Sequence, residues 1–177
     1  AKMVLADVME DLDERKIPFD PNLEIGMMVE VPSACVMIDQ FVNEVDFLSI
    51  GTNDLIQYTL AVDRSNKDVV GLYNSADPSV LKLIDMVVRA ADARGVPVNL
   101  CGQMSSSTVY TMLLLGLGLR RLSVTPGAIP EVKKICRSVT IASCQEVAQR
   151  ALAMENARDI KSFLKGELKK WVPEFVP

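Results

Sequence analysis

The stretch Ser49–Arg64 has the most chemically suggestive spacing in the sequence. Asn53 and Asp54 stand between an apolar run and an apolar helical segment over Leu55–Val62. At a strand exit that opens a helix, unpaired backbone N–H groups and the helix dipole both favour anions. Arg64, about three helical turns later, could reach back as a phosphate ligand. The alternative is an ordinary Thr or Asn helix cap with a surface arginine.

Two further candidates lie at the ends of other apolar runs. Glu30 stands near the end of Ile25–Val31, and Cys101 directly follows Val96–Leu100. Glu30 could share a hard cation such as Mg²⁺ with Asp54, or it could be a buried glutamate paired with a lysine. Cys101, beside a glycine, could be a proton donor or a nucleophile, or simply a small buried apolar residue.

Histidine is absent from the 177 residues. This excludes Ser–His and Cys–His nucleophile pairs, histidine metal sites and histidine general bases within the chain. Any chemistry here must therefore use carboxylates, cysteine, arginine, lysine or a hard metal ion.

The composition predicts a globular chain with an aliphatic, methionine-rich core. Hydrophobic residues make up 49% of it, charged residues 24% and aromatic residues 5%. A net charge of −4 argues against a nucleic-acid-binding surface. No apolar run approaches the roughly 20 residues of a membrane span, and the N-terminus lacks a signal-peptide pattern. Cys35, Cys101, Cys136 and Cys144 show no metal or redox spacing, which favours reduced thiols and a cytoplasmic location.

Apolar runs alternate with helical periodicity along the chain. Strands are expected over 25–31, 46–51, 96–100 and 122–125, and helices over 1–16, 32–43, 55–62, 77–93, 105–115, 128–137, 143–154 and 156–170. This alternation predicts a parallel α/β sheet with right-handed crossovers. The polar candidates, with Gln103 and Ser123 or Thr125, then lie at the carboxyl ends of strands, where α/β folds form their sites.

Two segments carry more specific expectations. The first helix, residues 1–16, is amphipathic and should pack against the body, and its uncapped beginning suggests a chain cut from something longer. The run 25–31 is continuously apolar apart from Glu30, which predicts a strand buried on both faces. Spacing alone does not distinguish an open four-stranded sheet from half of an eight-stranded barrel.

Three motifs, taken together, resemble one family. They are GMMVEVPSA at Gly26–Ala34, DFLSIGTNDLIQYTLAVDR at Asp46–Arg64 and CGQM at Cys101–Met104. They resemble the C-terminal domain of the phosphoenolpyruvate-utilising enzymes, and most closely the enzyme I type, the phosphoenolpyruvate–protein phosphotransferases of the bacterial sugar phosphotransferase system. The similarity runs from about residue 20 to residue 155.

The resemblance implies the C-terminal half, the last four βα units, of a TIM-type (β/α)₈ barrel that binds phosphoenolpyruvate and Mg²⁺ at its carboxyl-end rim. Glu30 and Asp54 match the family's metal-binding carboxylates. Asn53 matches a contact to the substrate phosphate, and Arg64 matches an arginine that holds that phosphate. Cys101 matches the thiol that delivers a proton to C3 of the enolate.

The sequence also departs from the family pattern. The family's phosphoryl acceptor is a histidine on a separate N-terminal domain, and the first half of the barrel, with its further arginines, is missing here. Gln103 stands where the family usually has glutamate, and Ser105 and Ser106 replace the usual Ala-Gly. A neutral amide at position 103 removes one negative charge from the rim.

These features together predict a fragment, residues 1–177, forming one partial barrel domain. The parent would be a Mg²⁺-dependent cytoplasmic transferase that passes the phosphoryl group of phosphoenolpyruvate to its own histidine and then to a phosphocarrier protein, releasing pyruvate. The chain alone should not turn over. A homodimer is expected, without nucleic acid or membrane insertion. The alternatives are the matching domain of pyruvate phosphate dikinase or phosphoenolpyruvate synthase, and a non-catalytic dimerisation module.

Overall fold

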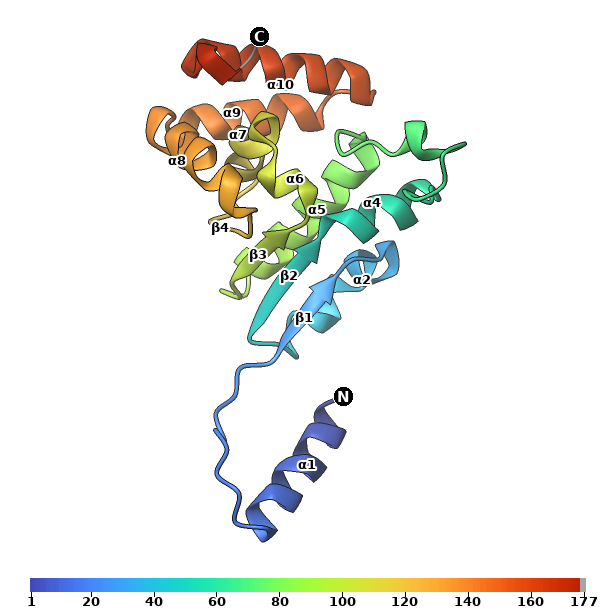
Figure 1. Ribbon diagram of the computed structural model, residues 1–177, viewed down its shortest axis with the longest axis vertical. Helices are drawn as coiled ribbons and strands as arrows, with labels where there is room; N and C mark the ends of the chain where they lie inside the picture. Colours follow the sequence, from blue (N-terminus) through green and yellow to red (C-terminus); the bar gives the residue numbers. More distant parts are fainter. Residues whose placement is uncertain (176–177) are drawn as a thin grey trace.

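A four-stranded parallel sheet forms the centre of the molecule. The computed structural model describes residues 1–175, and within them the strands lie in the order β1-β2-β3-β4 (Figure 1). The strands are β1 (Gly26–Val29), β2 (Phe47–Gly51), β3 (Val98–Cys101) and β4 (Arg121–Leu122). The α-helices are α1 (Lys2–Glu14), α2 (Pro32–Val36), α3 (Ile38–Phe41), α4 (Thr52–Leu60), α5 (Pro78–Asp92), α6 (Gln103–Ser106), α7 (Thr108–Gly116), α8 (Ile129–Ser138), α9 (Ile141–Leu152) and α10 (Ala157–Trp171). Short 3₁₀ helices are η1 (Val70–Leu72), η2 (Pro126–Ala128) and η3 (Pro173–Phe175).

The predicted alternation of strands and helices is confirmed, and all three strand pairs are parallel. The boundaries differ locally. The helix expected over 32–43 is interrupted at Met37, and the helix expected to begin at Ser143 is instead capped by Thr140. Ser143 serves as the third residue of that capping box. The closing VPEFVP tail ends in two residues that lie outside the described part of the chain.

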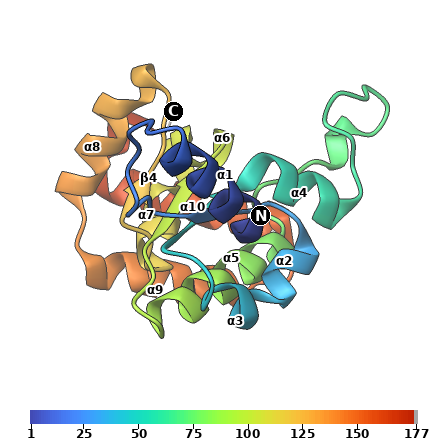
Figure 2. The same ribbon diagram turned by 90° about the horizontal axis from the view of Figure 1, so that it is seen from below.

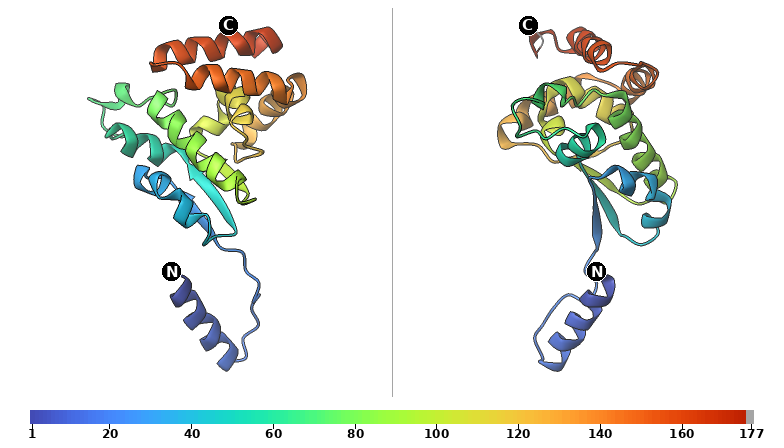
Figure 3. Two further views of the ribbon diagram at one scale, coloured as in Figure 1. Left: turned by 180° about the vertical axis from the view of Figure 1, so that it is seen from behind. Right: turned by 90° about the vertical axis from the view of Figure 1, so that its right-hand side faces the viewer.

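The two faces of the sheet differ sharply. Val29, Ile50 and Leu100 form one cross-strand row and are fully buried under helices. The preceding row consists of Met28 on β1, Ser49 on β2 and Asn99 on β3. This row faces the other side of the sheet, where Met28 is 46% exposed. Figure 3 shows β1 and β2 with helices packed on one side only. The prediction that residues 25–31 are buried on both faces is therefore wrong, because β1 is an edge strand with one uncovered face.

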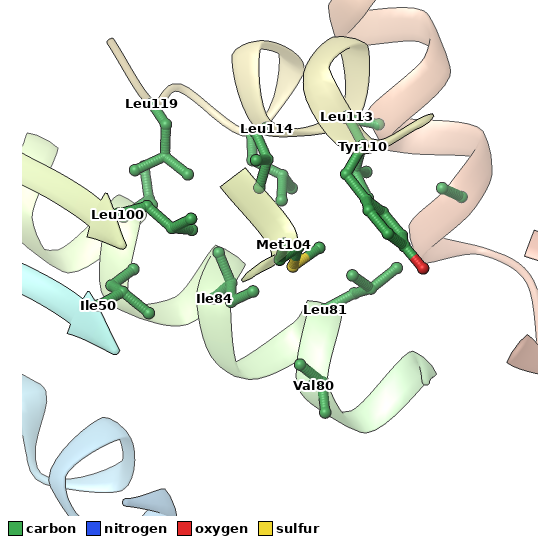
Figure 4. Packing of buried hydrophobic residues seen from close by; sticks show 14 of the residues in the cluster. Ile50, Val80, Leu81, Ile84, Leu100, Met104, Tyr110, Leu113, Leu114 and Leu119 are labelled. Atoms are coloured by element: carbon green, nitrogen blue, oxygen red, sulfur yellow. The ribbon is translucent and has the colours of Figure 1, made fainter. Parts of the chain in front are cut away.

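The core lies between the buried face of the sheet and the helices that follow it. In Figure 4, Ile50 and Leu100 from the strands face Ile84 of α5, and Met104 fills the space toward α7. This packing confirms the expected aliphatic core, but the expectation that it is rich in methionine is wrong, because Met104 and Met112 are buried while Met3, Met28, Met37 and Met86 are exposed. Helix α7 is apolar on nearly every side and packs against α8, α9 and α10, so most of its side chains lie in the core.

The first helix forms as expected, but it does not pack. None of the residues of α1 is buried, and Met3 and Val4 on its apolar face are 81% and 64% exposed. It lies at the end of the molecule opposite α10 (Figures 1 and 2). Its contact with the body includes an exposed Lys2–Glu44 ion pair at 3.0 Å. The prediction of a packing helix is therefore wrong for this chain. The segment between α1 and β1 holds the apolar face of α1 away from the core.

Among residues 1–175, no helix combines the length and the apolar character that crossing a bilayer would need.

Candidate functional site

The predicted site residues gather at the carboxyl-end edge of the sheet. Glu30 follows the last residue of β1, Asn53 and Asp54 follow β2 at the start of α4, and Cys101 is the last residue of β3. Because the strands are parallel and Gly51 pairs with Cys101, these positions share one rim. The sequence pattern therefore placed all of them at the correct end of the sheet.

Glu30 leans over the end of the neighbouring strand. A Cβ placed on Gly51 would lie 2.8 Å from Glu30 Oε2, so the carboxylate occupies the space that a side chain there would need. Glu30 is only half-buried, and among the ion pairs of residues 1–175 it has no partner. The alternative of a buried glutamate paired with a lysine is not found in the structure.

Asp54 and Arg64 are brought together across the loop that follows α4. Arg64 Nη2 lies 3.5 Å from Asp54 Oδ1, and both side chains are about four-tenths exposed. The Arg64 backbone N–H donates to Gln57 Oε1 at 3.1 Å, which places the arginine after the left-handed end of α4. An exposed pair of this kind contributes about 0–1 kcal/mol, so both charges remain available to a ligand.

Tyr73 is a neighbour that the sequence analysis missed. Its hydroxyl donates to the Asn53 carbonyl oxygen at 3.2 Å, which ties the 63–76 loop to the start of α4. Burial raises the pKa of Tyr73, while the charge of Arg64 opposes that rise. The sequence around Leu72–Asn74 carries no local signal for this contact.

Thr52 and Asn53 do not cap α4. The N-cap is Gly51, without a side-chain hydrogen bond. Thr52 Oγ1 instead donates to the Cys101 carbonyl oxygen at 2.8 Å, and Asn53 Oδ1 accepts from the Gln103 backbone N–H at 2.9 Å. The alternative of plain helix capping is therefore wrong for both residues. Since the Asn53 oxygen is engaged, the amide group is oriented with its Nδ2 donors left for another acceptor.

Cys101 is half-buried and lies beside polar groups of β2. Its Sγ is 3.5 Å from the Ile50 carbonyl oxygen, and Ser49 Oγ lies 3.9 Å from the same sulfur. Cys35 and Cys144, in contrast, are fully buried in helices, and burial raises the pKa of Cys35 to about 11 and that of Cys144 above its usual value. Cys101 is therefore distinguished from these core cysteines by its place at the rim.

A pocket of about 480 Å³ opens beside Cys101, between the ends of β3 and β4. It is lined by Asn53, Gly102, Gln103, Ser106, Ser107, Ser123, Val124 and Thr125. Most of the lining side chains are hydroxyls and amides, which suit a polar ligand. The sequence pattern puts Gln103, and Ser123 or Thr125, at strand ends, but it does not show that they surround one cavity.

Gly102 is required at this turn for two reasons. Its φ of +106° is a conformation that side chains rarely adopt. A Cβ there would also lie 2.3 Å from Thr52 Oγ1 and 2.9 Å from Asn53 Oδ1. Ser105 secures the other side of the turn by donating to the Gly102 carbonyl at 2.7 Å and to the Ser123 carbonyl.

The rim carboxylates fit a hard divalent cation only as part of a shared site. Along the described chain, no group of three or more His, Cys, Asp or Glu side chains could hold a metal by itself. Mg²⁺, however, is usually held by one or two carboxylates together with substrate phosphate oxygens and water. Glu30, unpaired over Gly51, and Asp54, exposed at the next strand end, have the donor chemistry for that arrangement.

Comparison with known proteins shows what the chain is similar to. Residues 1–141 match the model of "PEP-utilising enzyme, PEP-binding domain". The phosphoenolpyruvate-protein phosphotransferase of Buchnera aphidicola subsp. Acyrthosiphon pisum is 44% identical over 149 residues, covering 84% of this chain and 26% of the relative. That of Haemophilus influenzae is 42% identical over 163 residues, covering 92% and 28%.

A third relative has a different name. The multiphosphoryl transfer protein 1 of Escherichia coli is 44% identical over 143 residues, covering 81% of this chain and 17% of the relative. The chain thus spans about a quarter or less of the length of the curated relatives it matches. Because the family model covers most of the chain, the chain belongs to the PEP-utilising enzymes, through their PEP-binding domain.

Proposed function

We propose that this chain is the phosphoenolpyruvate- and Mg²⁺-binding part of an enzyme I-type phosphotransferase. The orientation of Asn53 carries the proposal: its oxygen is held by Gln103 N–H, which leaves the amide N–H₂ as a donor at the start of α4, where the next residue, Asp54, pairs with Arg64. A donor, a guanidinium and two carboxylates at one rim form a set that suits a phosphate with its cation. The similarity to named phosphotransferases supports this choice over pyruvate phosphate dikinase or phosphoenolpyruvate synthase.

Each residue then has a role in the transfer. Glu30 and Asp54 would hold Mg²⁺, which when bound neutralises part of the charge on phosphate and enolate. Arg64 would grip the transferring phosphoryl group, and Asn53 would donate an N–H to it. As the P–O bond breaks, its electron pair stays on the enolate oxygen. The Cys101 thiol would then give its proton to C3, leaving a thiolate and forming pyruvate.

The phosphoryl acceptor has to come from outside this chain, because the sequence contains no histidine. We place it on another domain of a longer parent, from which the group would pass to a phosphocarrier protein in the cytoplasm. In that parent, residues 1–177 would supply the last four βα units of a (β/α)₈ barrel. Without the other half, the chain should bind substrate weakly and should not turn over.

The competing function is a non-catalytic dimerisation module. The exposed apolar face of α1 and the uncovered face of β1 favour association. Of these surfaces, α1 lies away from the rim residues, whereas Met28 on the uncovered face of β1 adjoins Glu30 beside Gly51. Association through α1 is therefore compatible with substrate binding in one protein. The two functions differ in whether the rim binds substrate.

Calorimetric titration of the chain with phosphoenolpyruvate tests the proposed function. In Mg²⁺ we expect saturable heat with a dissociation constant on the order of 1 mM, because by this proposal residues 1–177 supply only part of the phosphate-binding groups. In EDTA the heat should vanish, because the carboxylates would then repel the substrate. Equal heats in Mg²⁺ and EDTA, or no heat in either, would favour the module.

A further inference from the structure

Thr52 has a fully buried polar side chain that reaches from the start of α4 to the end of β3. Its exposed fraction is 0%, and its hydroxyl donates to the Cys101 carbonyl oxygen at 2.8 Å. Buried hydroxyls do not always find a partner in this chain, since Thr59 Oγ1 and Thr111 Oγ1 have none within the described residues. The Thr52 contact is therefore a specific feature of the rim rather than a general property of buried threonines.

The hydroxyl holds the chain at the point where β3 ends. Cys101 is the last residue of β3 and pairs with Gly51, and the next residue, Gly102, turns with φ +106°. Thr52 Oγ1 lies where a Gly102 side chain would be, and Asn53 Oδ1 accepts the following N–H from Gln103. Backbone groups on both sides of this turn are thus bonded to consecutive residues of α4.

The pleat of β3 directs the Cys101 side chain to the open face, opposite to buried Leu100, and the Thr52 hydrogen bond holds that end of the strand in place. Cys101 turns its Sγ back to β2, toward the Ile50 carbonyl at 3.5 Å and the Ser49 hydroxyl at 3.9 Å. The thiol therefore stands on the open face of the sheet, and the Ser49 O–H can donate to the sulfur once its proton has left. Release of this carbonyl would let the end of β3 move away from β2 and uncover the half-buried sulfur.

We infer that Thr52 is a positioning residue for Cys101, and that its hydroxyl holds the thiol at the rim. This inference rests on the proposed function in one respect only, namely that the thiol would serve to protonate C3. The geometric part concerns the protein alone. It is therefore tested without substrate, so its failure is distinguishable from a failure of phosphoenolpyruvate binding.

The test is the rate of alkylation of each cysteine by iodoacetamide, followed by peptide mass spectrometry in the 177-residue chain. Thr52→Val keeps the shape of the side chain but removes the hydroxyl. We expect Cys101 to react about tenfold faster, the change that corresponds to losing one intramolecular hydrogen bond that keeps the turn closed. Exchange of the Gln103 amide proton should accelerate with it.

Three comparisons distinguish loss of positioning from a general loosening of the fold. Cys35 and Cys144 are buried in the core and report global opening, so their rates should not change in Thr52→Val. Thr52→Ser retains the hydroxyl and should restore the original Cys101 rate. Thr59→Val, on the same helix, removes a hydroxyl without a partner and should leave Cys101 unchanged.

Two results would overturn the inference. One is a Cys101 rate in Thr52→Val that equals the original rate while the protein stays folded. The other is a Thr52→Ser rate as high as that of Thr52→Val, since the methyl group and not the hydroxyl would then hold the turn. If Thr52→Val does not fold, Thr52→Ala removes the hydroxyl instead, and a Cys101 rate in Thr52→Ala equal to that in Thr52→Ser would overturn the inference.

Discussion

Glu30→Gln is expected to weaken divalent-cation binding in the presence of phosphoenolpyruvate by at least about a hundredfold. The substitution keeps the size of the side chain over Gly51 but replaces a charged oxygen donor with a neutral amide. When a site has only two protein carboxylates, neutralising one of them removes much of its affinity for the cation, because Mg²⁺ and its analogue Mn²⁺ are bound mainly by charged oxygen ligands. Mn²⁺ bound to the chain is measured directly, by the loss of the free-ion signal in electron paramagnetic resonance.

Glu24→Gln provides the matched control, since Glu24 is exposed and lies before β1. It makes the same chemical change and lowers the net negative charge equally, so any general electrostatic effect appears in both variants. Mn²⁺ affinity should be nearly unchanged in Glu24→Gln. Equal affinity in the two variants would remove Glu30 from the metal site.

Gly116→Ala is expected to be the most destabilising small change in the fold. Gly116 ends α7, and a Cβ there would lie 1.9 Å from the Cys144 carbonyl oxygen of α9. This oxygen belongs to the backbone and cannot rotate aside as a side chain could. Helices α7 and α9, which pack more extensively on each other than any other pair, must therefore separate. We expect a loss of about 3 kcal/mol in the free energy of unfolding, at the upper end of overpacking effects. Urea unfolding followed by circular dichroism measures this loss.

Gly166→Ala is the opposite case on a neighbouring helix. Gly166 lies within α10, and a Cβ there would meet open space. Alanine should stabilise the chain by about 0.5–1 kcal/mol, because it restricts the unfolded backbone and favours the helix. If both substitutions shifted the urea midpoint in the same direction, the close approach of α7 and α9 would not be the cause.

The order of elements and the location of the candidate site were predictable from local patterns. Apolar runs separated by helical periods identify a parallel sheet, and its geometry brings Glu30, Asn53, Asp54 and Cys101 to one rim. Asp77 followed by Pro78 was also sufficient to locate the start of α5, since a cap and a first-turn proline act within a few residues.

Contacts between distant residues were not predictable in this way. Thr52 and Asn53 have the composition of a helix cap, but tertiary partners at Cys101 and Gln103 take their side chains. No local rule shows that a residue fifty positions away offers a better acceptor. The same limit applies to Tyr73, whose contact with Asn53 depends on the path of a loop.

Burial was predicted least well where it depends on what covers an element. The apolar run around Met28 looked like a doubly buried strand, and α1 looked like a packing helix. Both have apolar faces, but the described chain covers only one side of β1 and leaves α1 exposed. Sequence periodicity indicates that a face is apolar, while only the surrounding structure determines whether that face is covered.

The roles of the rim residues remain predictions, and their shared claim is that phosphoenolpyruvate binds at the rim with a divalent cation. An NMR titration of the ¹⁵N-labelled chain with phosphoenolpyruvate tests this claim most directly. In Mg²⁺ we expect saturable shifts of the amides at 51–54 and 101–103, which disappear in EDTA and are not reproduced by inorganic phosphate. Shifts that persist in EDTA, that occur only on other surfaces such as α10, or that are absent altogether would contradict it.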